Sequence, residues 1–276
     1  MPAEPATPSG FEPVQVSCGT FAGVAGVPIR RDSWRPSARP RAALVLSHGM
    51  SEYGLRYDPL ARFLAARGIA VHSLDHRGHG HSGGETGTVE QFSYFLDDLA
   101  RFMTIVLSEE PGIPLVLLGH SMGGLIAAAC VLERQPRPDL LVLSGPAIVP
   151  VMEGGERRID ATRLTKDPEQ QRLYLEDPMI LRERVRDDLF PELFAGISLL
   201  VGRAGEITEP ILLIHGTDDR LCSAEGAKMW VEATSSSDIT VKLYAGGRHE
   251  MFNETNRAEV FADLWAWLDH RIPSAA

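Results

Sequence analysis

One serine in this chain lies in the pattern that turns a serine into a nucleophile. Ser121 is the central residue of Gly119-His120-Ser121-Met122-Gly123, which fits G-x-S-x-G. An apolar, strand-like segment at 115–118 precedes it, and a helix-forming segment at 125–132 follows it. A sharp turn between a strand and a helix has a strained backbone, and glycines on either side prevent collisions there. The serine hydroxyl is then presented above a sheet at a helix N-terminus, which suits attack on an acyl group.

A serine nucleophile needs a histidine base and a carboxylate that orients this base, and after such a turn the chain order is serine, acid, histidine. Of the nine histidines, only His249 and His270 follow the later apolar segments. His249 lies in a glycine-containing loop just after the strand-like segment 239–244, where active sites form. His270 ends the last expected helix, where a cation favours the helix dipole. We therefore predict that His249 is the base.

Two adjacent aspartates are candidates for the acid. Asp218 and Asp219 lie in the loop after the apolar segment 211–214. Either aspartate could also cap the turn by bonding its own backbone. The pattern of residues alone leaves both open.

The oxyanion that forms during acyl transfer needs two backbone N–H donors. One comes from the residue after the nucleophile, here Met122, and the other from the loop after an early strand. Ser47-His48-Gly49-Met50 follows the apolar residues 42–46, so the amide of Met50 is the second candidate.

A metal site is the alternative that the histidines suggest. His76, His79 and His81 fall within six residues, but in a glycine-rich loop without helical or strand spacing, so we interpret them as structural. The cysteines lie far apart and form no C-x-x-C pair: Cys18, Cys130 and Cys222. We expect free thiols, no metal and no cofactor.

The elements that must position these residues alternate along the chain. Apolar runs separated by amphipathic segments predict a mostly parallel sheet with helices on both faces. We expect strands at 42–47, 69–74, 114–118, 140–143, 211–214 and 239–244, after an antiparallel pair at 14–18 and 27–34. We expect helices at 57–67, 89–107, 122–134, 224–233 and 257–270.

The alternation is interrupted once, by a segment that we interpret as an inserted helical cap. Residues 153–188 hold 18 charged side chains, far above the 23% of the whole chain, and the apolar stretch 189–201 follows. The predicted division is a disordered tail at 1–12, a core at 13–147 and 208–276, and a cap at 148–207.

Composition excludes several classes of function. The 276 residues carry a net charge of −10 and no basic run, so we expect no nucleic-acid partner. The uncharged stretch 111–132 is interrupted by prolines and glycines, and a bilayer span needs about 20 continuous apolar residues. The first ten residues lack the features of a signal peptide, so we expect a cytoplasmic protein with at most weak peripheral membrane contact through the cap. The oligomeric state stays open.

Several segments together resemble the monoacylglycerol lipases of the α/β-hydrolase superfamily. They follow the family's order from about residue 40 onward: HGMSEYGLRY at 48–57, LDHRGHGHS at 74–82, GHSMGG at 119–124, EDP at 176–178, HGTDDRLC at 215–222 and GGRHEMFNE at 246–254. The resemblance implies an α/β-hydrolase fold and the triad Ser121, Asp219 and His249. It selects Asp219 over Asp218 because the family's acid precedes the Arg-Leu pair.

The resemblance also implies the reaction, which is hydrolysis of a monoacylglycerol to a fatty acid and glycerol. The triad does not distinguish this activity from that of a lysophospholipase, a thioesterase or a broad carboxylesterase, since specificity depends on the pocket and cap. An inactive hydrolase fold that only binds lipids is the alternative that is not an enzyme. The complete set of triad residues and donor loops argues against it.

For the glycerol we expect contacts from Glu52, Arg56 and Tyr174, the last placed by the resemblance. The alternative for the first two is an ion pair within the protein, which their i,i+4 spacing permits.

Two departures from the family concern the same region. Tyr53 stands where the family usually has histidine, and the cap is short around Gly154-Gly155. A shorter cap predicts a more open pocket and little affinity for lipid surfaces, unless the apolar stretch 189–201 supplies a lipid-facing surface by itself.

Overall fold

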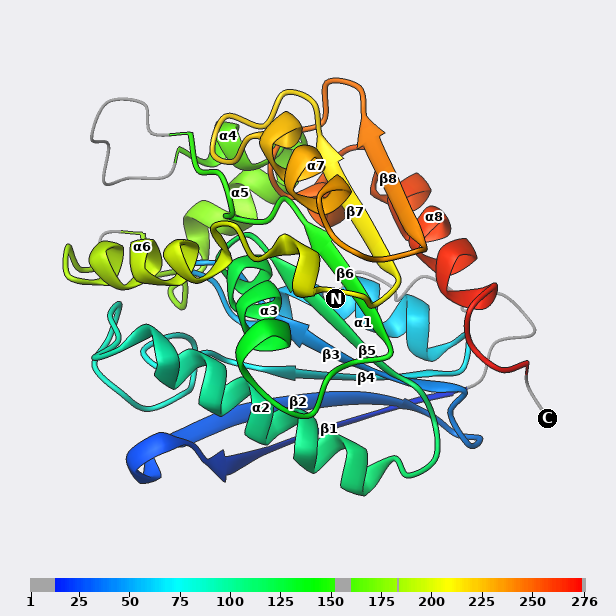
Figure 1. The fold of residues 1–276 in the computed structure, drawn as a ribbon. Coiled ribbons are helices and arrows are strands. Elements are labelled where there is room, and N and C mark those ends of the chain that lie inside the picture. The colour runs from blue at the N-terminus through cyan, green and yellow to red at the C-terminus, as the bar shows by residue number, and fades with distance from the viewer. Residues whose placement is uncertain (1–12, 152–159, 183, 275–276) are drawn as a thin grey trace.

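The computed structural model describes residues 13–151, 160–182 and 184–274. The predicted tail at 1–12 and the Gly154-Gly155 pair lie outside these residues. An eight-stranded sheet of order β1-β2-β4-β3-β5-β6-β7-β8 crosses the molecule (Figure 1). Its strands are β1 Val14–Ala22, β2 Pro28–Pro36, β3 Ala42–Ser47, β4 Ile69–Leu74, β5 Leu115–His120, β6 Leu140–Ser144, β7 Ile211–Gly216 and β8 Ile239–Tyr244.

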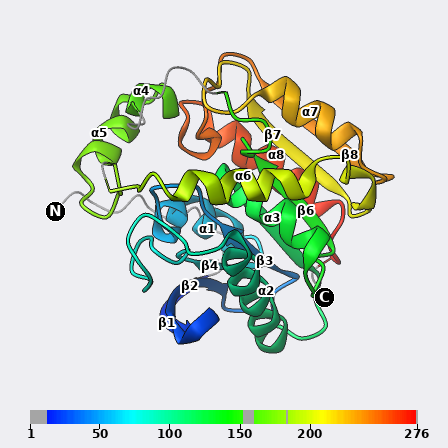
Figure 2. The same ribbon diagram turned by 60° about the vertical axis from the view of Figure 1, so that its left-hand side comes forward.

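Six of the strands run parallel to one another, and the β1–β2 hairpin pairs antiparallel with β4 at one edge. Helices cover both faces of the sheet (Figure 2). They are α1 Asp58–Ala65, α2 Phe92–Glu109, α3 Met122–Glu133, α4 Ala161–Leu164, α5 Pro168–Glu176, α6 Leu189–Leu200, α7 Ala224–Glu232 and α8 Arg257–Asp269. The predicted α/β-hydrolase architecture is therefore confirmed.

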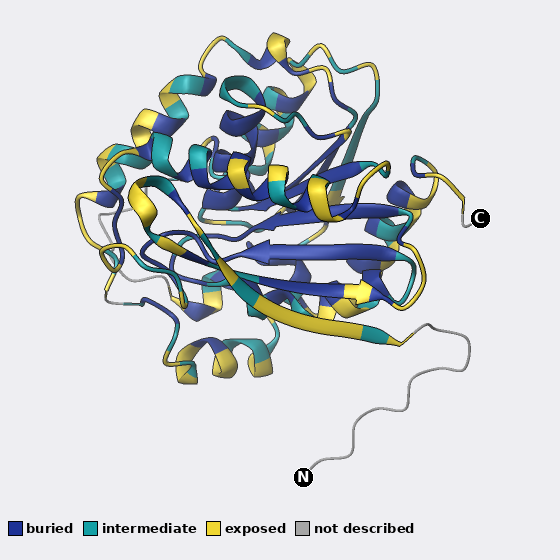
Figure 3. Ribbon diagram, turned by 90° about the horizontal axis from the view of Figure 1, so that it is seen from below, coloured by how far each residue is buried: buried dark blue, intermediate teal, exposed yellow. Residues whose placement is uncertain are grey.

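Side chains of each central strand alternate between two apolar cores because successive residues point to opposite faces. Val45, Leu117 and Leu143 pack with α2 and α3 on one face. Leu44 and Val116 pack with α1 and α8 on the other. The central strands are buried, whereas β1 at the edge is largely exposed (Figure 3). A sheet that is buried on both faces holds its C-terminal loops on a rigid support.

Element ends differ from the sequence-based expectation where distant residues determine them. The predicted helix at 89–107 begins three residues later, at Phe92. The Phe92 amide donates to Glu192 Oε2 at 2.7 Å, so a carboxylate from α6 satisfies the first turn of α2. A partner 100 residues away along the chain leaves no signal in the local pattern.

The segment between β6 and β7 that we predicted as a cap holds α4, α5 and α6 (Figure 2). Backbone hydrogen bonds tie it to core loops. The amide of Leu181 donates to the carbonyl of Ser51 at 2.8 Å, and that of Arg186 to Gly87 at 2.9 Å. Helix α6 runs across α3 (Figure 2) and packs on α2 and α3. Among the described residues, no helix is both long and apolar enough to cross a bilayer.

Candidate active site

Ser121 lies on the turn between β5 and α3, with φ of 52° and ψ of −120°. A non-glycine residue at positive φ is strained, and such strain concentrates at functional sites. Its amide donates to the Ser144 carbonyl at 3.0 Å, which holds the turn against β6. A Cβ at Gly123 would lie 2.1 Å from the Ser47 carbonyl oxygen, so only glycine lets α3 approach the end of β3. This approach brings the serine beside the loop that carries Met50.

His249 and Asp219 form a buried hydrogen-bonded pair. Nδ1 of His249 donates to Oδ2 of Asp219 at 2.8 Å, and their side chains are 4% and 0% exposed. The other carboxylate oxygen, Oδ1, accepts the amides of Leu221 at 2.8 Å and Cys222 at 3.0 Å. Because Nδ1 carries the proton that points at the carboxylate, Nε2 is the basic nitrogen of His249. His249 and Ser121 line the same cavity.

Asp218, the other candidate for the acid, pairs with arginines instead. Its side chain is 35% exposed and lies 3.5 Å from the guanidinium of Arg220 and 4.0 Å from that of Arg248. His270, the other candidate base, lies exposed at the end of α8. The structure therefore brings Asp219 and His249 together, and not their alternatives.

Charge within the site adjusts the protonation of these groups. Burial lowers the pKa of His249, but the Asp219 carboxylate outweighs it, so the pKa of His249 is raised above its ordinary value. Burial raises the pKa of Asp219, but the His249 imidazole outweighs it and lowers that pKa to about 2. His120 lies beside His249, with ring centroids 4.8 Å apart. Burial and the neighbouring His249 lower the pKa of His120 to about 4, so His120 is neutral near pH 7.

The two predicted oxyanion donors, the amides of Met50 and Met122, bond no other residue within the described part of the chain. Met122 is the first residue of α3, where amides have no partner within the helix. His48 Nδ1 donates to the Gly49 carbonyl at 2.7 Å, and His48 Nε2 accepts the His76 amide at 2.8 Å. The Gly49 carbonyl and the Met50 N–H belong to one planar trans peptide group, so they point in opposite directions. By binding this carbonyl, His48 therefore directs the Met50 N–H away from itself.

The predicted glycerol contacts Glu52 and Arg56 form the ion pair that their spacing permits. Glu52 Oε2 and Arg56 Nη1 are 2.6 Å apart, and both side chains are buried. Glu52 lines the cavity, and so does Tyr174, whose ring lies 5.4 Å from the guanidinium carbon of Arg56. Tyr53 donates its hydroxyl hydrogen to Asp177 Oδ2 at 2.7 Å and so ties the Met50 loop to the cap.

The cavity that contains Ser121 and His249 has a volume of about 360 Å³. One part of its wall is polar, with Glu52, Tyr174 and Glu250. The rest is largely apolar and includes four residues of α6 at helical spacing. The apolar lining consists of Met50, Met122, Leu125, Ala147, Val151, Phe190, Leu193, Phe194 and Ile197, among others. Helix α6 therefore gives the cavity an apolar wall, although the cap is shorter than the resemblance implies.

Among the loop histidines and the cysteines, the groups that enter this arrangement are two backbone amides, those of His76 and Cys222. His76 and His79 pack in the buried interior against His48, while the side chain of His81 is 45% exposed. Among the described residues, no group of three or more His, Cys, Asp or Glu side chains is arranged to hold a metal. Cys222 borders the cavity, and burial raises its thiol pKa well above the ordinary value, so it stays protonated.

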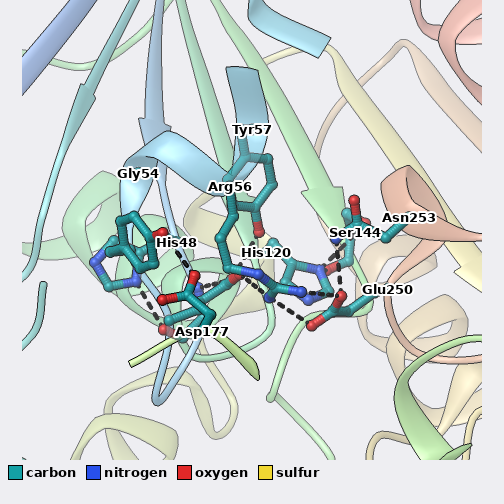
Figure 4. Close-up of polar contacts among 12 residues, drawn as sticks. His48, Gly54, Arg56, Tyr57, His120, Ser144, Asp177, Glu250 and Asn253 are labelled. Carbon is teal, nitrogen blue, oxygen red and sulfur yellow. Dashed lines mark hydrogen bonds and ion pairs between the residues drawn. The ribbon is translucent and has the colours of Figure 1, made fainter. Parts of the chain in front are cut away.

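Sequence reasoning missed three residues that shape the site: His48, His120 and Glu250. The first two lie inside the motifs HGM and GHSMGG, within two positions of Met50 and Ser121. Glu250 follows His249 directly, and its partner Arg56 is 194 positions away. Figure 4 shows Arg56 pointing toward Glu250, with Asn253 beside it. A carboxylate next to the predicted base was a signal that could have been followed.

Comparisons with known proteins identify a family and a fold that this chain shares. Residues 38–256 match the family described as "Serine aminopeptidase, S33". The chain is 34% identical to the monoacylglycerol lipase of Mycolicibacterium smegmatis, with 90% of this chain and 95% of the relative covered. It is 32% identical to the monoglyceride lipase of Rattus norvegicus, with 88% and 87% covered. A soluble variant of the monoglyceride lipase of Saccharomyces cerevisiae, solved with a substrate analog, superposes with a TM-score of 0.79 at 23% identity over 99% of this chain and 100% of that one.

Proposed function

The chain belongs to the monoglyceride lipase family of the α/β-hydrolase superfamily, and we propose that it hydrolyses monoacylglycerols to a fatty acid and glycerol with Ser121 as nucleophile. One observation carries the proposal. The Asp219–His249 hydrogen bond of 2.8 Å ends at a cavity that Ser121 also lines. A nucleophile, a base and an orienting acid beside one apolar cavity are the parts that acyl transfer from a lipid ester needs.

In the proposed reaction, His249 Nε2 takes the Ser121 proton while the serine oxygen attacks the ester carbonyl. The negative charge that develops on the carbonyl oxygen is stabilised by the amides of Met50 and Met122. His249 then protonates the glycerol oxygen as the C–O bond breaks, which leaves an acyl group on Ser121. Water, deprotonated by His249, attacks the acyl-enzyme and releases the fatty acid.

Asp219 supports two of these steps. It holds His249 in the tautomer with a free Nε2, and it stabilises the imidazolium that forms when His249 takes the proton. The two backbone amides on Oδ1 fix the carboxylate, so little rearrangement is needed during the reaction.

The cavity wall suggests how the substrate lies. Its apolar part, formed by α6 and by residues near α3, suits an acyl chain, and its polar part suits glycerol. Within the described part of the chain the hydroxyl of Tyr174 has no hydrogen-bond partner, so it is available to a glycerol hydroxyl in the cavity. Glu52 and Arg56 bind each other, and we propose that they act on glycerol mainly by holding Tyr174 and the Met50 loop.

Arg163 favours a second candidate substrate, since it lines the same cavity. A guanidinium recognises phosphate oxygens well. A lysophospholipid would place such a group beyond the ester.

Hydrolysis of a substrate panel tests the proposal. Monoacylglycerols of increasing chain length are compared with diacylglycerols, lysophospholipids and p-nitrophenyl esters of the same acyl chains. We expect monoacylglycerols to give the highest kcat/KM. Faster turnover of lysophospholipids, slowed selectively by Arg163→Met, would replace monoacylglycerol by the second candidate.

A further inference from the structure

We propose that Glu250 is a positioning residue for this reaction. Together with Arg56 and Glu52 it forms a buried bridge that joins the base, His249, to the Met50 loop at 47–50, called the oxyanion loop below. The inference rests on the proposed ester hydrolysis and assigns a role to a residue outside the triad and the oxyanion donors. It follows from a continuous series of short polar contacts.

The first link of the bridge is a two-point ion pair between Glu250 and Arg56. Oε1 of Glu250 lies 2.7 Å from Arg56 Nη1, and Oε2 lies 2.8 Å from Nη2 (Figure 4). Asn253 Nδ2 donates to the same Oε2 at 2.8 Å. A planar guanidinium that meets both carboxylate oxygens fixes direction as well as distance.

The second link joins Arg56 to the oxyanion loop. Nη1 of Arg56 also donates to Glu52 Oε2 at 2.6 Å. The other oxygen of Glu52, Oε1, accepts the Gly49 amide at 2.6 Å and the Tyr57 hydroxyl at 2.8 Å. The bridge therefore reaches both parts of the proposed site. Glu250 directly follows the base His249, and Gly49, which Glu52 binds, directly precedes the oxyanion donor Met50.

All three charged side chains of the bridge are buried, with exposures of 6% for Glu250, 10% for Arg56 and 3% for Glu52. Removing one partner of a buried ion pair leaves an uncompensated charge, so such a bridge resists distortion. Burial raises the pKa of Glu250, but the Arg56 guanidinium outweighs it and holds that pKa at about 2, so Glu250 is ionised at neutral pH.

The charges of the bridge also act on the base. Two carboxylates and one guanidinium leave one excess negative charge, and a negative charge near an imidazole favours its protonated form. Among the described residues, the titratable groups that act on His249 include His215 at the end of β7, Asp219 in the loop that follows it, His120 at the end of β5, Glu52 in the loop after β3, and Glu250. Glu250 and Glu52 act in the same direction as Asp219.

The bridge has two separable consequences, one of geometry and one of charge. Glu250→Gln removes the charge and weakens the contact with Arg56. Glu250→Asp keeps the charge but is one methylene too short for the two-point contact. We expect the Gln variant to lower kcat by about tenfold and to move the acid midpoint of kcat/KM down by about 0.5–1 pH unit. We expect the Asp variant to lower kcat by about threefold or more, with the midpoint within about 0.2 pH unit of wild type.

Glu209→Gln is the matched control. Glu209 also forms a two-point pair with an arginine, with Oε2 2.8 Å from Arg137 Nη2, and its side chain is 7% exposed. It precedes β7, at the end of the sheet opposite the site. This control removes the same kind of ion pair without touching the base or the oxyanion loop.

The experiment measures two pH profiles for the full chain and the three variants, with thermal unfolding as the check on folding. The first is kcat/KM and KM for p-nitrophenyl butyrate, and the second is the rate at which a fluorophosphonate labels Ser121. We expect both Glu250 variants to lower kcat while KM stays within about twofold of wild type. We expect only Glu250→Gln to shift the acid midpoint in both profiles. If the Gln variant does not fold, the Asp variant decides by its kcat.

A Glu250→Gln profile that matches that of Glu209→Gln, or an Asp variant with wild-type kcat, would overturn the bridge. The labelling profile separates this result from a failure of the proposed substrate. If the wild-type chain labels at Ser121 but does not cleave monoacylglycerols, the substrate assignment fails, and the labelling rates of the variants still decide the role of Glu250.

Discussion

Replacing Asp219 with asparagine removes one charge while keeping the shape of the side chain. The two oxygens of Asp219 have different partners, which determines how asparagine must sit. Oδ1 accepts two backbone amides, from Leu221 and Cys222, and Oδ2 accepts Nδ1 of His249. An asparagine has one oxygen, and the two amides require an acceptor. Its NH2 group therefore faces His249.

That orientation forces the wrong tautomer on the base. A donor opposite Nδ1 needs a lone pair there, so the imidazole proton moves to Nε2, which can no longer accept the Ser121 proton. The opposite rotamer would keep the tautomer but leave two buried backbone donors facing an NH2 group, at about 1–3 kcal/mol each. A cost of about 2–6 kcal/mol corresponds to a rate loss of about 30-fold to above 10⁴-fold. With the lost stabilisation of the imidazolium, we expect kcat to fall by about 10³–10⁴-fold.

The assay is kcat for p-nitrophenyl butyrate near pH 8, with Asp218→Asn as the matched control. Asp218 is 35% exposed and, within the described part of the chain, its carboxylate pairs with two arginines at 3.5 and 4.0 Å, so we expect the control within about threefold of wild type. If Asp218→Asn cost more than Asp219→Asn, or if Asp219→Asn kept activity within tenfold of wild type, the acid would be misassigned.

Four further outcomes are expected. Ser121→Ala lowers kcat by about 10⁴-fold or more with unchanged thermal unfolding; activity within tenfold of wild type would remove this residue from its role. The acid limb of kcat/KM has its midpoint above about pH 6.5, because the raised pKa of His249 keeps the base protonated, and thus inactive, below that point. A midpoint below 6 would contradict this electrostatic account. Tyr174→Phe raises KM for monoacylglycerols about three- to tenfold but not KM for p-nitrophenyl butyrate, and an unchanged KM for both would end its assignment to glycerol. In sedimentation with liposomes, little protein is expected in the pellet, because charged side chains surround the exposed apolar residues of the described cap, which are Val149, Leu173, Leu175, Phe194 and Val201; strong binding that is lost on changing Leu175 and Val201 to serine would indicate an interfacial enzyme.

Local pattern was sufficient for the sheet and for the motif that it carries. The strands β3, β4 and β8 have the predicted bounds, since uninterrupted apolar runs of strand length specify strands buried on both faces. Ser121 and His249 could be predicted because a strand and a turn leave a clear trace in the sequence. The start of α2 was not predictable in this way, because Glu192 of the cap completes its first turn.

Tertiary partners explain the rest of the site. Asp218 and Asp219 are equivalent in the local sequence, and only the path of the β7 loop decides which one faces His249. The spacing of Glu52 and Arg56 permitted an ion pair between them. It gave no sign that Glu250, near the other end of the chain, also binds Arg56. Contacts between segments so distant in sequence depend on the fold as a whole, which neither periodicity nor a motif records.

The most direct test of Ser121 as the nucleophile is peptide mapping of the chain after reaction with a fluorophosphonate, with monoacylglycerol hydrolysis followed in parallel. We expect one adduct per chain, on Ser121, and a loss of hydrolysis in proportion to its formation. An adduct on another residue, or hydrolysis that persists when Ser121 is fully modified, would contradict it.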